Sequence, residues 1–380
     1  MEISVVGAGE MGRATLGLLA RWLPDARFSV IDRSSANLEK AVAIQPDRIS
    51  PDVADVSSAL PDLAGCALVA NFAGPFYGGS DTVARAALQH GCTYVDICDD
   101  VEGIQPILAL DEHARAAGVA LITGAGNSPG TSNVMAKRLL ELHPECDGIR
   151  IVWVVGDTHP GGLAPLRHML HMAVAPCPVW QDGQFIQERG FVSATAMTHD
   201  LPEIGSTEVY NTAHSEPITL ARAFPRLRHA SVQGALLPGW ANEVFSTLGR
   251  IGFGYDDLTV DVGGQQVEPV EVLWKVLWAR HRRRHQGEQR DGLTIVQVQA
   301  LKGSDVYAKM TIVDHHSMVR TTALGAAGAI LSILERTPPP GAWGTEILEA
   351  EPTLDTVARL AEEEQAIPGG FLVEVPAATV

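Results

Sequence analysis

The distribution of hydrophobic and polar residues changes character along the chain. Up to about residue 125, short β-rich runs alternate with stretches whose apolar residues recur at helical spacing. The runs expected to be strands are Ile3 to Val6, Phe28 to Ile31, Ala67 to Asn71, Thr93 to Ile97 and Val119 to Thr123. The stretches expected to be helices are Met11 to Leu23, Ser34 to Ala43, Asp81 to His90 and Ile104 to Ala117. This alternation predicts β-α-β units and a doubly wound parallel sheet.

Beyond Pro129-Gly130 the runs alternate residue by residue and turn signals appear. A strand is expected at Ile149 to Val155, and Asp182-Gly183 lies between two further β-rich runs, as in a tight hairpin. Thr294 to Leu301 and Val306 to Val313 flank another turn and form a second expected antiparallel pair. The pattern predicts a mixed α/β domain that contains antiparallel strands.

The last apolar stretch, Val319 to Leu334, is rich in Ala, Gly and Leu, which suits a helix packed closely against another element. A chain of 380 residues is too long for one ordinary hydrophobic core. We therefore expect an α/β protein with a first domain at residues 1–127 and a second at 128–318. A C-terminal helical segment at 319–380 is expected to pack back on the first domain.

Charge and cysteine content narrow the classes of partner and compartment. The formal charge of −17 repels phosphate backbones and anionic lipid surfaces, so neither nucleic acid nor a membrane is an expected partner. Five cysteines in no paired spacing indicate reduced thiols, and thus a cytoplasmic protein. An apolar run begins directly after Met1-Glu2, and no stretch reaches about 18 uninterrupted apolar residues, so we expect neither a signal peptide nor a transmembrane helix.

The clearest chemical motif is the turn Gly7-Ala8-Gly9-Glu10-Met11-Gly12, which follows the first expected strand and opens a helix. The first glycine permits a tight turn, the second lets the backbone approach a pyrophosphate, and the third lets helix and strand pack closely. Unpaired N–H groups at the helix start then face the phosphates. The motif predicts a Rossmann-type domain that binds a nicotinamide dinucleotide through these residues.

Asp32 ends the second expected strand, twenty residues after Gly12. Its carboxylate is suited to accept hydrogen bonds from the adenosine ribose and to repel a 2′-phosphate, which favours NAD. The next residue, Arg33, can stack on adenine or pair with a 2′-phosphate. NAD is therefore the expected cofactor, and NADP stays possible.

Three further segments fall at the carboxyl edge of the expected sheet, where doubly wound folds bind ligands. The loop Asn71-Phe72-Ala73-Gly74-Pro75-Phe76 is expected to lie against the cofactor, with Asn71, Ala73, Gly74 and Pro75 in contact. The next strand ends in the carboxylates Asp96, Asp99 and Asp100, any of which can alternatively cap the following helix. In the loop from Gly124 to Asn133, Asn127 and Ser128 are candidate ligands of a substrate carboxylate, although a plain interdomain turn is the competing interpretation.

These motifs, in this order and spacing, resemble the saccharopine dehydrogenase-like family of NAD(P)-dependent oxidoreductases. The resemblance is carried by the Asn71 to Phe76 loop, the segment Gly91 to Asp96, the loop Gly126 to Asn133 and, near the end, Thr321 to Leu334. The turn Gly7 to Gly12 looks like the branch of saccharopine reductases, carboxynorspermidine dehydrogenases and lysine ε-dehydrogenases. It implies hydride transfer at a C–N bond of an amino acid or polyamine, with Asp96 and Asp99 as candidate catalytic carboxylates.

The second domain supplies candidates of its own. His214, in Tyr210 to Pro217, is a possible acid or base, and Arg222 suits a substrate carboxylate or an exposed salt bridge equally well. His168 and His171 are three residues apart, but no third ligand is spaced locally, so no metal is expected and His168 is assigned to the substrate cleft.

The leading hypothesis is a homodimeric NAD(P)-dependent dehydrogenase or imine reductase of the saccharopine type, acting on a small amino-acid-like molecule. One alternative is a lysine ε-dehydrogenase, which deaminates oxidatively. An alternative from another class is a dinucleotide-binding sensor or scaffold without turnover.

Overall fold

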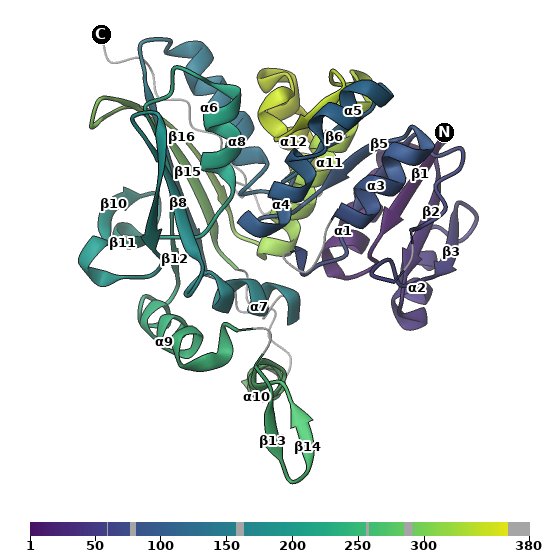
Figure 1. Cartoon of the computed structure of the whole chain (residues 1–380), viewed down its shortest axis with the longest axis horizontal. Helices are drawn as coiled ribbons and strands as arrows, with labels where there is room; N and C mark the ends of the chain where they lie inside the picture. Colours follow the sequence, from purple (N-terminus) through teal and green to yellow (C-terminus); the bar gives the residue numbers. More distant parts are fainter. Residues whose placement is uncertain (59, 77–80, 157–162, 256–257, 285–291, 364–380) are drawn as a thin grey trace. The chain divides into compact units, whose positions relative to one another are not determined.

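The computed structural model describes residues 1–380 apart from 59, 77–80, 157–162, 256–257, 285–291 and 364–380 (Figure 1). The chain divides into two compact units. Unit 1 contains Met1–Glu141 and the described chain from Val319 onward, and unit 2 contains Leu142–Met318. The first division lies at Glu141/Leu142, whereas the sequence placed it at 127/128.

Unit 1 is built on a parallel sheet of seven strands in the order β17-β6-β5-β4-β1-β2-β3. The strands are β1 (Glu2–Val6), β2 (Arg27–Asp32), β3 (Ile49–Val53), β4 (Leu68–Asn71), β5 (Thr93–Asp96), β6 (Ala120–Ile122) and β17 (Gly341–Trp343). The predicted doubly wound α/β fold is confirmed. The two edge strands, β3 and β17, were not predicted, because β3 has only one buried residue and β17 comes from the far end of the chain.

The helices of unit 1 are α1 (Glu10–Trp22), α2 (Ser35–Val42), α3 (Asp81–His90), α4 (Val101–Leu108), α5 (Asp111–Ala117), α6 (Thr131–Leu142), α11 (Met318–Glu335), α12 (Ala350–Glu363) and the short turn η4 (Thr345–Ile347). The single helix expected at Ile104 to Ala117 is two helices, with the break at Ala109 and Leu110.

The C-terminal segment explains the position of the division. Lys137 of α6 donates to the carbonyl of Leu348 at 2.7 Å, and the Asn133 amide donates to Glu346 at 2.8 Å. These contacts hold α6 in unit 1, beside the segment that returns from the end of the chain. Such long-range pairing leaves no local sign in the sequence.

Helix α11 is long and apolar enough to cross a membrane by length and composition. However, its small residues are buried in unit 1. A Cβ on Gly325 would lie 2.2 Å from the carbonyl oxygen of Gly126, and a Cβ on Gly328 would lie 2.4 Å from Val357 of α12. The helix therefore occupies the position of a core helix, and its glycines permit the close packing.

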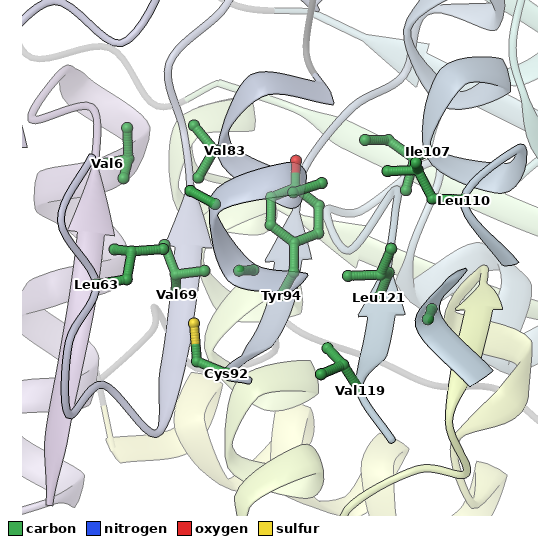
Figure 2. Packing of buried hydrophobic residues seen from close by; sticks show 14 of the residues in the cluster. Val6, Leu63, Val69, Val83, Cys92, Tyr94, Ile107, Leu110, Val119 and Leu121 are labelled. Carbon is green, nitrogen blue, oxygen red and sulfur yellow. The ribbon is translucent and has the colours of Figure 1, made fainter. Parts of the chain in front are cut away.

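The core of unit 1 surrounds Tyr94, whose side chain is fully buried (Figure 2). Val69 and Leu121 flank it from the neighbouring strands, while Val83 and Ile107 come from helices α3 and α4. Because strands of a parallel sheet are covered on both faces, their sequences read as nearly continuous apolar runs. The Tyr94 hydroxyl is the polar exception, and its partners belong to the candidate site below.

Unit 2 contains a mixed sheet in the order β10-β11-β12-β7-β15-β16, with β8 pairing β12 and β9. Strands β7 and β12 are parallel and the other pairs are antiparallel, so the predicted mixed domain is confirmed. The strands are β7 (Gly148–Val155), β8 (Pro176–Gln181), β9 (Gln184–Arg189), β10 (Met197–Leu201), β11 (Gly205–Asn211), β12 (His229–Leu236), β15 (Thr294–Lys302) and β16 (Asp305–Asp314). Asp182 and Gly183 join β8 to β9 with φ of 49° and 88°, as a tight hairpin turn requires.

The remaining elements of unit 2 are α7 (Leu163–His171), α8 (Glu216–Ala223), α9 (Trp240–Leu248), α10 (Pro269–Arg284), the short turns η2 (Ser193–Thr195) and η3 (Gly249–Phe253), and the hairpin β13 (Val260–Val262) with β14 (Gln265–Val267). Trp274 and Trp278 of α10 stack on one another, and Trp274 packs against a cluster formed by Leu166, Leu170 and Val270.

Candidate functional site

The glycine-rich turn is held tightly against the loop after β4. Gly7 has φ of +91°, and a Cβ there would lie 2.6 Å from the backbone carbon of Phe72. A Cβ on Gly12 would lie 2.0 Å from the carbonyl oxygen of Gly7. Both positions therefore require glycine, one for its conformation and both for the close approach of backbone.

Gly9 differs from its two neighbours, because a Cβ there would meet nothing within 4 Å. It is the N-cap of α1, and as a glycine it places no side chain of its own over that helix start. Glu10 and Met11 begin the helix and are partly exposed. An open backbone surface at a helix N-terminus fits the pyrophosphate of a dinucleotide, whose oxygens accept hydrogen bonds from such N–H groups.

The Asp32 carboxylate is oriented by backbone amides. Its Oδ2 accepts a hydrogen bond from the Ala8 N–H at 2.6 Å, and its Oδ1 accepts one from the Ser34 N–H at 2.7 Å. Asp32 thus fixes the glycine-rich turn to the end of β2, and each oxygen keeps a second lone pair for a ribose hydroxyl. Arg33 is exposed beside it, so the edge offers both a carboxylate and a guanidinium.

The loop after β4 reaches the cofactor edge through its backbone rather than through Asn71. The Asn71 side chain is buried, accepts from the Ala73 N–H at 3.1 Å and donates to the Tyr94 hydroxyl at 3.2 Å. Gly74 and Pro75 are exposed. Asn71 therefore shapes the loop, while Ala73 to Pro75 form its accessible part.

Asp96 is the hub of this edge and is only 1% exposed. Its carboxylate accepts hydrogen bonds from the Tyr94 hydroxyl at 2.7 Å, the Thr123 hydroxyl at 2.9 Å and the backbone N–H groups of Cys98 at 2.9 Å and Gly124 at 2.8 Å. Burial raises the pKa of Asp96, and these donors oppose that shift. The sequence assigned Asp96 to catalysis, whereas the geometry favours a positioning role, since the carboxylate ties the ends of β5 and β6 together.

The other two carboxylates after β5 differ in access. Asp99 is partly exposed, and Asp100 is buried at the N-cap of α4. Between them and Asp96 lies Cys98, whose thiol pKa is raised by burial and by the three neighbouring carboxylates. Of the two predicted catalytic carboxylates, Asp99 is therefore the one open to a ligand.

The loop after β6 contains a buried acceptor without a partner. Asn127 is 8% exposed, and its Oδ1 has no hydrogen-bond partner among the residues that the structure describes. Its backbone carbonyl accepts from the Ser132 N–H at 2.9 Å, which holds the loop at the start of α6. Ser128 is partly exposed. Because buried polar groups are nearly always satisfied, the Asn127 amide is a candidate ligand contact.

Unit 2 brings two predicted site residues together. The His214 ring is 4% exposed and lies between two others: it stacks on Trp153 with a centroid distance of 5.6 Å and meets His168 edge-on, also at 5.6 Å. His214 Nδ1 lies 3.3 Å from Oε2 of the fully buried Glu216, although the two atoms are not aligned as a hydrogen bond. The side chains of Trp153, His168, His214 and Glu216 are called the imidazole cluster below.

Sequence reasoning missed Trp153 and Glu216. In the sequence Trp153 is one apolar residue in a strand, but a Cβ on Gly234 would lie 2.0 Å from its indole, which lies flat over that glycine. Glu216 reads as an acidic residue in the first turn of α8. Arg222 is in the last turn of the same helix and is exposed, so its side chain is not part of the cluster.

Comparison with known proteins agrees with this geometry. Residues 3–152 match the family model described as the saccharopine dehydrogenase NADP binding domain. Saccharopine dehydrogenase (L-Glu forming) from Saccharomyces cerevisiae is 14% identical, with a TM-score of 0.65, over 99% of this chain and 100% of that one. At this identity the likeness shows the fold.

Two other solved structures align over most of the chain with lower scores. A probable dehydrogenase from Thermotoga maritima is 12% identical, with a TM-score of 0.46, over 96% of this chain and 97% of that one. GenD2 from gentamicin A biosynthesis, in complex with NAD, is 13% identical, with a TM-score of 0.42, over 98% and 96%.

Proposed function

Because this chain carries the NAD(P)-binding domain of the saccharopine dehydrogenase-like oxidoreductases, we propose that it oxidises or reduces a C–N bond in an amino-acid-like or polyamine-like substrate. The coarser activity, that of an NAD(P)-dependent oxidoreductase, follows from the family domain. The substrate class and the residues that act on it form the proposal.

In the direction of oxidation, the substrate loses a hydride and a proton. The substrate C–H bond breaks with its electron pair, the N–H bond loses a proton, and a C=N bond forms. A bound nicotinamide dinucleotide would accept the hydride. Water then adds to the imine and splits it into a carbonyl compound and an amine. The protein must therefore hold a cationic nitrogen near the cofactor and take one proton from it.

The imidazole cluster is the observation that carries the proposal. His214 is the candidate base, since a neutral imidazole nitrogen can accept a proton from the substrate. Glu216 Oε2, 3.3 Å from its Nδ1, would stabilise the imidazolium so formed. The Trp153 ring stacks on His214 and would hold the imidazole in position during proton transfer.

Turnover assays test this proposal. Absorbance of the reduced nicotinamide is followed with NAD and NADP on lysine, on saccharopine-like adducts and on pairs of keto acid and amine. We expect His214→Gln to lower kcat by about 100-fold and Glu216→Gln by about tenfold, with unchanged dinucleotide affinity. His113→Gln, in the exposed part of α5, is the matched control.

The outcomes separate the alternatives. Turnover of lysine alone would favour oxidative deamination of the ε-amine. Tight dinucleotide binding without turnover on the whole panel would indicate a sensor. Full activity of His214→Gln would remove the imidazole cluster from the mechanism. The homodimer and the cytoplasmic location stay predictions.

A further inference from the structure

Unit 2 contains a cavity that lies away from the imidazole cluster. It has a volume of about 370 Å³, which is within the range of small-molecule sites. It lies where β7 and β12 begin and where β15 turns into β16. Its lining residues are Asp147, Arg150, Gln181, Asp182, Arg228, His229, Leu301, Gly303 and Ser304.

Arg150 supplies a positive charge that no carboxylate among the described residues pairs with directly. The side chain is half-buried, and burial lowers the pKa of Arg150. Its Nη1 donates to Gln299 at 3.2 Å, but its buried Nε has no hydrogen-bond partner among the described residues. It forms no ion pair with a described carboxylate. A desolvated guanidinium without a counter-ion destabilises the folded state. An arginine at this position is therefore more easily explained by a ligand than by stability.

The remaining charges of the cavity have the opposite balance. Arg228 pairs with Asp182 at 2.6 Å and lies 4.0 Å from the Asp147 carboxylate. Asp147 also accepts a hydrogen bond from the Gly303 N–H at 2.8 Å. Around Arg228 the cavity wall thus holds two carboxylates, those of Asp147 and Asp182, for one guanidinium. The cavity therefore has a positive charge at Arg150 and an excess of negative charge at these two aspartates.

We propose that this cavity binds a small zwitterion, such as a free α-amino acid, with its carboxylate on Arg150 and its ammonium group at Asp147. The part of the Arg150 guanidinium that lines the cavity would pair with the ligand carboxylate. A dianion such as phosphate gains less, because the two aspartates repel it. The cavity is separate from the imidazole cluster: His229 is five residues before Gly234 on β12, or about 16 Å along the strand.

Thermal unfolding of the full chain tests the proposal without dinucleotide and without turnover. The probes are L-alanine, acetate, ethylamine and inorganic phosphate at constant ionic strength. L-Alanine at about ten times its Kd should raise Tm by about 2–4 °C, and the other probes by less. His214→Gln should keep this response, which separates it from binding at the imidazole cluster.

Three variants locate the response. Arg150→Gln should unfold at a higher temperature than the unmodified chain, because it removes a desolvated charge, and should lose the shift. Asp147→Asn should lose the preference for L-alanine over acetate. Arg226→Gln, an exposed arginine outside the cavity, should match the unmodified chain.

The proposal is overturned if Arg150→Gln keeps the L-alanine shift, or if acetate stabilises the protein as much as L-alanine does. Because no step requires catalysis, these results are independent of the proposed oxidoreductase substrate.

Discussion

Two buried polar groups, the Asp96 carboxylate in unit 1 and the His214 imidazole in unit 2, are similarly shielded from solvent but differ in their partners. Asp96 accepts hydrogen bonds from four well-placed donors in two segments of the chain, 94–98 and 123–124. Among the described residues, His214 Nδ1 has just the poorly aligned Glu216 carboxylate at 3.3 Å. A buried group whose hydrogen bonds are all made stabilises the fold. A buried group with an unmade hydrogen bond can instead bind a ligand or exchange a proton.

This contrast assigns different tasks to the two regions. The carboxyl edge of the unit 1 sheet is a platform in which the loops after β5 and β6 are tied to the Asp96 carboxylate. In the proposed function, proton transfer belongs to the imidazole cluster of unit 2. Each of the following changes tests one side of the contrast.

The largest effect is expected for Gly7→Ala. The new Cβ would collide with Phe72 backbone at 2.6 Å and would impose a side chain on a residue with φ of +91°. We expect dinucleotide affinity to fall by at least about 100-fold, or about 2.7 kcal/mol, together with a lower Tm. The measurement is a titration with NADH and NADPH followed by fluorescence.

Two glycines of the same region are matched controls. Gly9→Ala meets no atom within 4 Å, so it should keep Tm and weaken only the dinucleotide. Gly17→Ala, in the body of α1 and equally open, should leave binding unchanged and stabilise the helix slightly. Equal affinities in all three variants would refute the role assigned to the turn.

Asp96→Asn should lower the free energy of unfolding by about 2 kcal/mol, because an amide cannot accept from all the donors that converge on this carboxylate. Urea unfolding measures the change. Asp55→Asn is the control, since the Asp55 carboxylate accepts from Ser57 in an exposed turn. If both variants lose the same small amount of unfolding free energy, the Asp96 carboxylate does not hold the platform together.

The smallest effect concerns His199, an imidazole of unit 2 that is fully hydrogen-bonded. Its Nε2 pairs with Gln233 Oε1 at 2.9 Å and its Nδ1 with Gln299 Nε2 at 3.3 Å. The Nδ1 contact, in which the amide donates, fits the neutral ring, and burial lowers the pKa of His199 below 6.5. Its stabilising contribution is therefore complete above pH 6.5 and is lost as pH falls through the lowered pKa.

The corresponding measurement is the free energy of unfolding between pH 7.5 and 5. His199→Gln should reduce the pH dependence of the free energy of unfolding by at most about 1.4 kcal/mol per pH unit. The control His113→Gln, at an exposed position, should leave that pH dependence unchanged. A steeper dependence in His199→Gln would reverse the sign of this argument.

Much of the fold was predictable because the signals are local. The strands at Ile3 to Val6 and Ile149 to Val155, the hairpin at Asp182-Gly183 and the apolar helix from Val319 all lie where periodicity and turn residues placed them. The helix expected at Ile104 to Ala117 was wrong in its continuity, because apolar periodicity persists through the break at Ala109.

The candidate site was predictable only in part. The glycine-rich turn needs particular backbone angles and close contacts, so its function depends on residue types that the sequence displays. The task of an aspartate depends on its surroundings instead. Asp96 and Asp99 look alike in the sequence, yet one is buried among donors and the other is partly exposed.

The sequence by itself therefore determined most of the alternation of strands and helices up to about residue 125 and the place of the dinucleotide turn, since both follow from spacing within a few turns of chain. Tertiary structure alone decided that the chain end supplies β17, that Asp96 is enclosed by the strands around it, and that Trp153, His168 and His214 meet. These features arise from contacts between segments tens to hundreds of residues apart, for which burial and packing, rather than local pattern, select the partners.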